Sequence, residues 1–428
     1  MTDNRPYHRY TLSNAVRLLL IPMHGVNSIA TSVMVGVGSR YETPQINGIS
    51  HFLEHMVFKG TKKYPTTDDV NIIEKVGGLQ NAYTDIDVTN YHNKALSTDW
   101  ELALEVNKEL ALSPLLLQEH VDKERDVIIE EMKRYEDEPA AKVEEAYHMM
   151  LYPSTTLGMR IIGTERSLRS VASKELKLYH ERQYSPERMV VVLAGVVSRQ
   201  SSAIRQKTEE WFGNIKPRKT TSIEKVSLKQ EKPRLEVVTK PDAQQAHLVI
   251  GLRTFERRSE DRFAWNLFNL IMGVSFTSRL FREIREKRGL CYHIRSSSGN
   301  FEEVGSWDIY AGVATEKVTL ATQAILGELG KAKENGITQE ELQIARKRLK
   351  TLLAFKSEDP EFFTEWYGRQ EVYNQDILTV DDYIKKIESV TKNDINHLIR
   401  KYFKTETLNM ALVWNRKKDD TLEKLLKI

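Results

Sequence analysis

Residues 91–95 read Tyr-His-Asn-Lys-Ala, and 216 positions later residues 307–311 read Trp-Asp-Ile-Tyr-Ala. Both segments lie in stretches with the composition and apolar pattern of strands. The expected elements around the two segments also follow one order. In the first half we expect a strand over 29–37 and helices over 50–58, 98–112 and 118–135; in the second half we expect a strand over 246–252 and helices over 263–286, from 315 and from 339. The sequence therefore predicts an α+β protein with two homologous domains of roughly 210 residues, each a mainly antiparallel sheet covered by helices.

A polar segment separates the two halves. Residues 216–234 are rich in charged residues, Ser, Thr and Pro and contain few apolar residues. Such composition is typical of an exposed crossing between domains. We therefore expect one domain over residues 1–215 and a second over residues 235–428.

Composition narrows the class of protein. Among 428 residues, 63 are Lys or Arg and 60 are Asp or Glu, a near balance that gives no case for a nucleic-acid or membrane-surface protein. No apolar run approaches the ~20 residues that a membrane helix needs, and the N-terminal residues lack the apolar core of a secretory signal. The single cysteine, Cys291, excludes an intramolecular disulfide and favours a reducing, cytoplasmic location.

The sharpest chemical signal is His51-Phe-Leu-Glu-His55, in the helix expected over 50–58. Residues four apart share one face of a helix, so both imidazoles can reach one metal ion, and Glu54 projects beside them. The carboxylate is then placed to take a proton from a water molecule at the metal. Zinc fits this role because it activates water and accepts nitrogen and oxygen ligands. The alternative is a helix that carries two surface histidines.

A catalytic zinc needs a third protein ligand, and a downstream helix offers two candidates. Glu124 and Glu131 share a stripe at helical spacing with Val127, Ile128 and Tyr135. Because the stripe carries branched apolar residues, it is predicted to face the core, where an unpaired carboxylate is costly. The two glutamates are therefore predicted to be a metal ligand and a residue that supports the ligands, unless they pair with a neighbouring helix.

Three segments resemble the pitrilysin/insulinase-type zinc peptidases, especially half-length bacterial members and the subunits of the mitochondrial processing peptidase. These segments are His51–Thr61, Gly77–Thr84 and Glu124–Glu131. The resemblance covers nearly the whole chain, since the family also has the duplicated unit. In the family the distal ligand is a Glu seven residues after another essential Glu. The same spacing here implies that Glu131, and not Glu130, is the ligand and that Glu124 has the supporting role.

The resemblance also implies contacts with the substrate. The family pairs the substrate backbone with the edge strand that contains Asn81-Ala82-Tyr83, although an ordinary central strand would show the same pattern. Its active members have an Arg followed seven residues later by a Tyr, here Arg285 and Tyr292, which contact the carbonyl near the scissile bond. A guanidinium and a phenol suit a developing oxyanion. The alternative is a structural Arg and a core Tyr. Cys291 has no dedicated base beside it and is expected to be a buried structural residue.

The activity that the resemblance implies is zinc-dependent hydrolysis of peptide bonds in short or unfolded polypeptides. His51, His55 and Glu131 would hold one Zn²⁺ per chain, and Glu54 would act as the general base. The chain is half the length of the single-chain members that form a complete chamber. A homodimer, or a heterodimer with a paralogue, is therefore expected, with active sites shared between chains. The alternative is a non-catalytic peptide-binding subunit of a heterodimeric peptidase.

Overall fold

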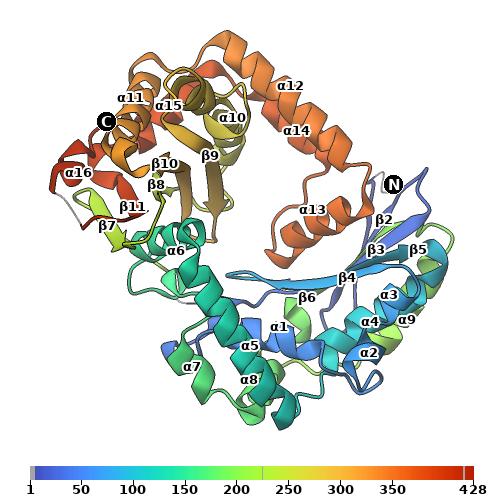
Figure 1. The fold of residues 1–428 in the computed structure, drawn as a ribbon. Helices are drawn as coiled ribbons and strands as arrows, with labels where there is room; N and C mark the ends of the chain where they lie inside the picture. Colours follow the sequence, from blue (N-terminus) through green and yellow to red (C-terminus); the bar gives the residue numbers. More distant parts are fainter. Residues whose placement is uncertain (1–4, 224, 418–419) are drawn as a thin grey trace. The chain divides into compact units, whose positions relative to one another are not determined.

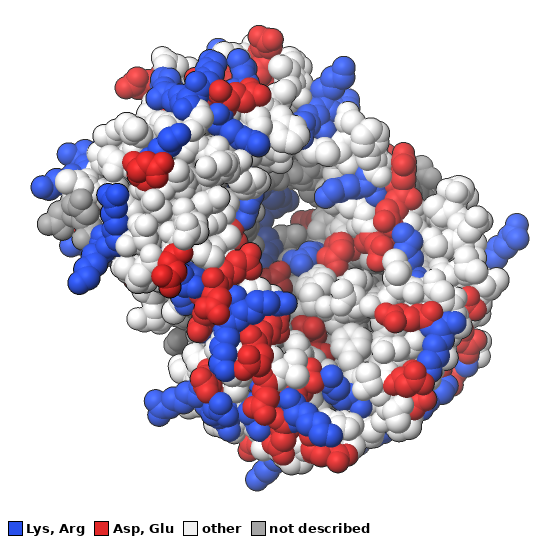
Figure 2. Space-filling view, viewed as in Figure 1, with Lys and Arg blue, Asp and Glu red and all other residues white. Residues whose placement is uncertain are grey.

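The computed structural model describes residues 5–223, 225–417 and 420–428, which form two compact units, each built on one sheet (Figure 1). The units are discontinuous in sequence. The first contains Met1–Met132, Met159–Glu224 and Ala354–Thr379, and the second contains Lys133–Gly158, Lys225–Leu353 and Val380–Ile428. None of the described helices combines the length and apolar character that a membrane span requires. Side chains of both signs are interspersed over the face seen in Figure 2.

The sheet of the first unit has the strand order β1-β2-β6-β3-β5-β4. The strands are β1 His8–Thr11, β2 Arg17–Pro22, β3 Ser28–Val35, β4 Leu79–Thr84, β5 Thr89–Leu96 and β6 Met189–Gly195. The β2–β6 pair is parallel, and the other pairs are antiparallel. Alternate residues of β2 enter different cores, with Leu18 and Leu20 on one face and Leu19 and Ile21 on the other. Burial on both faces explains why residues 18–21 of this strand are all apolar.

The sheet of the second unit has the order β7-β11-β8-β10-β9. The strands are β7 Arg234–Thr239, β8 Gln245–Thr254, β9 Cys291–Asn300, β10 Gly305–Ala314 and β11 Asn409–Trp414. Its one parallel pair is β7–β11, and the other pairs are antiparallel. The order therefore matches that of the first sheet without β1. Residues 91–95 and 307–311 lie in β5 and β10, which occupy equivalent positions, so the duplicated α+β unit is confirmed.

Helices cover both sheets. They are α1 Ile49–Val57, α2 Thr67–Val70, α3 Ile72–Lys75, α4 Trp100–Leu112, α5 Gln118–Asp137, α6 Pro139–Leu151, α7 Glu165–Ser170, α8 Ser173–Gln183, α9 Ser201–Phe212, α10 Asp261–Gly273, α11 Val318–Asn335, α12 Gln339–Lys356, α13 Pro360–Val372, α14 Val380–Ser389, α15 Lys392–Tyr402 and α16 Asp420–Leu425. The helix expected from Thr98 begins at Trp100 instead, because Ser97–Asp99 forms a 3₁₀ turn. The helix expected over 263–286 ends at Gly273, and a separate π-helical turn covers Phe281–Glu286.

Two helices are exchanged between the sheets. Helix α13, from the second half of the sequence, packs on β2, β3 and β6, whereas α6, from the first half, packs on β7, β8 and β11 (Figure 1). Gly368 allows the close approach of α13, because a Cβ at this position would lie 2.8 Å from the sulfur of Met34 in β3. The domains predicted from the sequence, 1–215 and 235–428, are each one continuous stretch. The compact units are discontinuous because of these helix contacts.

A matching arginine holds the C-terminal end of each exchanged helix. Arg17 of β2 donates from Nη1 to the carbonyl of Glu371 over 3.3 Å, and Arg234 of β7 donates from Nη1 to the carbonyl of Met150 over 3.1 Å. Strands β2 and β7 occupy equivalent positions in their sheets. A cation near the last carbonyls of a helix complements the negative end of the helix dipole. The exchange is thus stabilised in the same way in both units.

Candidate metal centre

A buried carboxylate fixes the start of helix α1. Glu42 accepts hydrogen bonds from the backbone N–H of Gly48 (2.7 Å) and of Ser50 (2.8 Å), which are among the groups that a helix N-terminus leaves unpaired. Gly48 has φ 94°, and a Cβ there would lie 2.7 Å from the carbonyl oxygen of Ile162. Glycine is therefore required at this position, and the helix that follows has a fixed direction.

Helix α1 separates apolar from chemically active residues. Phe52, Leu53 and Met56 are fully buried in the main core of the first unit. His51 and His55 lie four residues apart on the half-buried face. The packing of the apolar face thus presents both imidazoles on one side of the helix.

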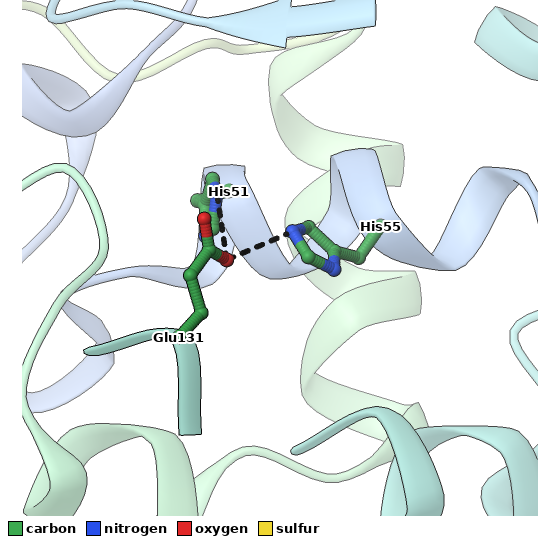
Figure 3. Close-up of side chains that lie close together, drawn as sticks. All are labelled: His51, His55 and Glu131. Carbon is green, nitrogen blue, oxygen red and sulfur yellow. Dashed lines mark ion pairs between the residues drawn. The ribbon is translucent and has the colours of Figure 1, made fainter. Parts of the chain in front are cut away.

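Three side chains converge beside this face (Figure 3). Nε2 of His51 lies 3.9 Å from Oε2 of Glu131 on α5, and Nε2 of His55 lies 3.5 Å from the same oxygen. One ligand atom from each of the three residues lies within 4.8 Å of the others. In the part of the chain that the structure describes, this is the only group of His, Cys, Asp or Glu residues that could hold a metal ion.

A second carboxylate orients one of the imidazoles. Nδ1 of His55 donates to Oε1 of Glu124 over 3.0 Å, which leaves Nε2 turned toward Glu131. Nζ of Lys59 lies 2.7 Å from the other oxygen of Glu124. Burial alone would raise the pKa of the Glu124 carboxyl, but the hydrogen bonds from His55 and Lys59 hold it below its ordinary value. Sequence reasoning missed Lys59, although its spacing of four residues from His55 was a usable signal.

The donor set fits a zinc ion. Two imidazoles and one carboxylate form a set found in catalytic zinc sites, where water takes the fourth position. Nδ1 of His51 is buried and has no hydrogen-bond partner among the described residues. Burial and the charge of His55 lower the pKa of His51 to about 4, so this imidazole is neutral at pH 7. Burial also lowers the pKa of His55, but Glu124 and Glu131 outweigh it and raise the value to about 9, so a metal would displace a proton there.

Glu54 lies on α1 next to the two histidines. Burial raises the pKa of its carboxyl to about 7, while the charge of His55 and hydrogen bonding by Thr84 oppose the shift. Thr84 is the last residue of β4, so this strand ends beside the site. A carboxyl group with a pKa near neutrality can both take up and return a proton at pH 7.

The prediction for the apolar stripe on α5 is wrong in part. Glu124 and Ile128 are buried as predicted, but Val127 is 52% and Tyr135 is 39% exposed. The buried face of α5 instead runs from Val121 through Glu124, Ile128 and Ile129 to Met132. Val127 lies on the flank of this face, and Tyr135 lies beyond Met132, where the first unit ends.

The segment expected to contact substrate, Asn81-Ala82-Tyr83, lies in β4 at the edge of its sheet, not in a central strand. The backbone N–H of Ala82 donates to the side-chain Oδ1 of Asn81 over 2.9 Å. The phenol of Tyr83 donates to Glu365 of α13 over 2.8 Å, so its side chain is held by the exchanged helix. The role of this segment in substrate binding stays a prediction.

The other predicted site residues belong to the second unit. Arg285 is exposed, and its guanidinium stacks on the ring of Phe281 at 4.8 Å. Tyr292, at the start of β9, is 63% exposed and is not the core residue of the alternative reading. Cys291 is buried as expected, and burial raises the pKa of its thiol to about 11, which keeps the thiol protonated at neutral pH.

Comparison with known proteins agrees with this site. Residues 18–165 match the family described as insulinase (peptidase family M16), and residues 170–349 match the peptidase M16 inactive domain. The chain is 34% identical over 406 residues to a protein named uncharacterized zinc protease YmxG from Bacillus subtilis. The aligned residues make up 95% of this chain and 97% of that protein.

Solved structures share the fold. A protease from Helicobacter pylori matches with a TM-score of 0.89 at 23% identity, over 95% of this chain and 99% of the other. The periplasmic protease PqqL from Escherichia coli matches with a TM-score of 0.80 at 18% identity, over 100% of this chain and 50% of PqqL. With both family segments in order along the sequence and a relative similar over nearly its full length, the chain belongs to the insulinase family of peptidases, family M16.

Proposed function

We propose that the protein is a zinc-dependent endopeptidase that cleaves short or unfolded polypeptides. The observation that carries the proposal is the convergence of His51, His55 and Glu131, with Glu54 on the same helix as the two histidines. When bound, zinc supplies a Lewis acid that polarises the scissile carbonyl and the attacking water. The relatives named as zinc proteases support the same chemistry.

The protein's own groups have separate roles in this proposal. Glu54 takes a proton from the attacking water and returns it to the leaving amine, a role that its position on α1 beside the two histidines permits. Glu124 holds the orientation of His55. Arg285 and Tyr292 donate hydrogen bonds to the developing oxyanion, which their exposure permits.

The substrate is bound as an added strand in this proposal. Strand β4 is the last strand of its sheet, and main-chain hydrogen bonds along its outer edge hold an extended peptide without reading most of its sequence. A folded protein cannot offer such a segment without local unfolding. Efficient cleavage inside a stable folded domain would contradict this part of the proposal.

The test compares the wild-type protein with Glu54→Gln. Both should contain about one zinc per chain by elemental analysis, because the described ligands remain in the variant. Turnover of unstructured peptides of graded length should fall by about 10² to 10⁴ in the variant, the range for loss of a general base. Cleavage by Glu54→Gln at the wild-type rate would remove Glu54 from the mechanism. A zinc-loaded wild-type protein that binds peptides but cleaves none would favour the non-catalytic subunit.

We also propose that active sites are shared within a homodimer, or within a heterodimer with a paralogue. The chain spans half of PqqL, and the zinc cluster and the Arg285–Tyr292 pair lie in different units of this chain. Shared sites predict that two inactive variants, Glu54→Gln and the double variant Arg285→Ala, Tyr292→Phe, complement each other. After subunit exchange, about a quarter of all sites should be whole. No recovery, with exchange confirmed by labelled subunits, would show that each site is built within one chain. A cytoplasmic location remains a prediction.

A further inference from the structure

Two adjoining cavities lie in the second unit, where the segment after α10 and the π-helical turn Phe281–Glu286 meet α12. The smaller has a volume of about 170 Å³ and the larger about 720 Å³, and both are lined by Ser275, Phe276 and Arg348. The zinc cluster lies in the first unit, so these cavities are separate features of the fold. Arg285 is the one residue of the proposed mechanism that lines the smaller cavity.

Aromatic rings form one wall of the smaller cavity. Phe276 and Phe281 contact each other edge to face with their ring centres 5.0 Å apart, and the guanidinium of Arg285 stacks on Phe281 at 4.8 Å. Phe276 is 75% exposed, so its ring is open to solvent at this wall. Arg348 of α12 also lines the cavity, together with residues of β9. An exposed ring at the mouth of a concave site is suited to pack against an incoming side chain.

The lining of the smaller cavity carries positive charge only. Its polar side chains include Arg285, Arg295, Arg348 and His293, and it contains neither Asp nor Glu. Glu144 neutralises Arg295 through an ion pair. No carboxylate lies within ion-pair distance of Arg285 or Arg348 in the described residues 5–223, 225–417 and 420–428. Nε of Arg348 is buried and, within the same residues, has no hydrogen-bond partner.

The larger cavity does not share this charge. Arg279 is held there by Glu341 through two hydrogen bonds of 2.5 and 2.7 Å. Glu286 and Glu340 balance the two other arginines of the lining, Arg282 and Arg348. An anion entering from solvent would therefore be attracted to the smaller cavity rather than to the larger one.

We propose that the smaller cavity binds the carboxylate of an Asp or Glu side chain in the peptide substrate. This inference rests on the proposed peptidase function and adds a preference for acidic substrates to it. A planar guanidinium can bind a carboxylate through two parallel hydrogen bonds, and Arg348 lines the cavity on α12 without an ion-pair partner among the described residues. The methylene groups of the acidic side chain pack on Phe276. Lys and Arg side chains are rejected by the same charges.

The experiment measures binding rather than cleavage. The full-length, zinc-loaded Glu54→Gln protein is titrated with fluorescent unstructured peptides that carry a single Glu, moved one position at a time, or Gln at the same position. Mass spectrometry checks that the peptides stay intact. At one register the Glu peptide should bind about tenfold more tightly than the Gln peptide, the size expected for a charge-assisted hydrogen bond. The difference should shrink in high salt.

Substitutions at Arg348 test whether this cavity is responsible. Arg348→Leu should abolish the preference for Glu without weakening binding of the Gln peptide, and Arg348→Lys should retain part of the preference. Lys347→Leu is the matched control, since Lys347 is exposed on the same helix but does not line either cavity. Thermal unfolding confirms that each variant is folded.

Three outcomes would overturn the inference. One is equal binding of Glu and Gln peptides at every register, and another is an equal loss of preference in Lys347→Leu. The third is a loss of binding only when the peptide C-terminus is amidated, which would assign the site to a terminal carboxylate. Failure of the peptidase function is seen separately, as zinc-loaded wild-type protein that does not cleave these peptides.

Discussion

At the scale of single residues, the candidate metal centre is a chain of contacts that begins outside the ligands. Lys59 holds Glu124, Glu124 holds Nδ1 of His55, and Nε2 of His55 faces Glu131. The sequence predicted the residue types and the spacing on α1, because a single helix fixes that geometry. It did not show that Glu124 lies against Nδ1 of His55, since this contact depends on how α5 packs against α1.

Lys59 is expected to act on zinc affinity through Glu124. Lys59→Met should weaken zinc binding by about tenfold, the lower range for loss of an outer partner of a metal ligand, because Glu124 then holds His55 less firmly. Lys59→Arg should restore most of the affinity. Competition with a chromophoric chelator measures both. Unchanged affinity in Lys59→Met would show that Glu124 needs no partner.

Neighbouring glutamates on α5 should differ sharply. Glu131→Gln should lose zinc, because its carboxylate is one of the three converging groups, whereas Glu130→Gln should retain it, since Glu130 is exposed on another side of the helix. Elemental analysis of the two purified variants is the measurement. Equal zinc content in both variants would contradict the assignment of Glu131 as the ligand.

At the scale of elements, local pattern was a good guide where one element decides its own geometry. Helix α1 and strands β3, β8 and β10 were predicted because their residues have the apolar pattern of a helix or a strand. The prediction was wrong over 263–286, where one helix was expected but the structure has two separate segments, α10 and the π-helical turn. Gly273 is the last residue of α10 and packs against β9, where a Cβ would lie 2.5 Å from the hydroxyl of Ser296. In the segment that follows, the hydroxyl of Ser278 donates to the carbonyl of Ser275. Both contacts depend on the fold around them.

Strand β10 carries a pH-dependent element of stability at Asp308. Ser297 donates to its carboxyl over 2.7 Å, but burial outweighs this bond and raises the pKa of Asp308 from 3.8 to about 6. A raised pKa favours the protonated form in the folded state. The contribution to the free energy of unfolding is therefore complete below pH 3.8 and is lost as the pH rises through about 6.

Asp308→Asn should remove this dependence, since the amide keeps an acceptor for Ser297 and has no charge. Relative to the wild type, the variant should gain about 3 kcal/mol of unfolding free energy between low pH and pH 7. Denaturant unfolding at several pH values measures the gain. The exposed Asp381→Asn serves as control and should show no comparable change. A pH-independent difference for Asp308→Asn would contradict the assignment.

At the scale of the whole molecule, the exchange of α6 and α13 was beyond sequence reasoning. Periodicity shows that each helix has an apolar face, but it does not show which of two similar sheets that face will cover. In the structure, Tyr367 and Val372 of α13 complete a core with Val190, Val192 and Met34 of the first sheet. The first domain predicted from sequence therefore lacks one of the layers that its own sheet requires.

A fragment of residues 1–215 should consequently be insoluble or aggregate, because the face of the sheet that contains Met34 and Val192 is left open to water. Joining residues 354–379 to its end through a flexible linker should increase the soluble yield several-fold. Soluble yield and cooperative thermal unfolding measure the effect. A stable, soluble 1–215 fragment without the added helix would contradict it.

The packing of α13 on the first sheet also determines when the first unit can finish folding during synthesis. A ribosome that has made residue 215 must still add the chain up to Val372 before the first sheet can be covered. At about 5 to 20 residues per second this takes roughly 8 to 30 s, far longer than hydrophobic collapse. During that interval the open face is a surface for chaperones or for misassembly. The first half of the protein is made early, but it can finish folding only when the second half is nearly complete.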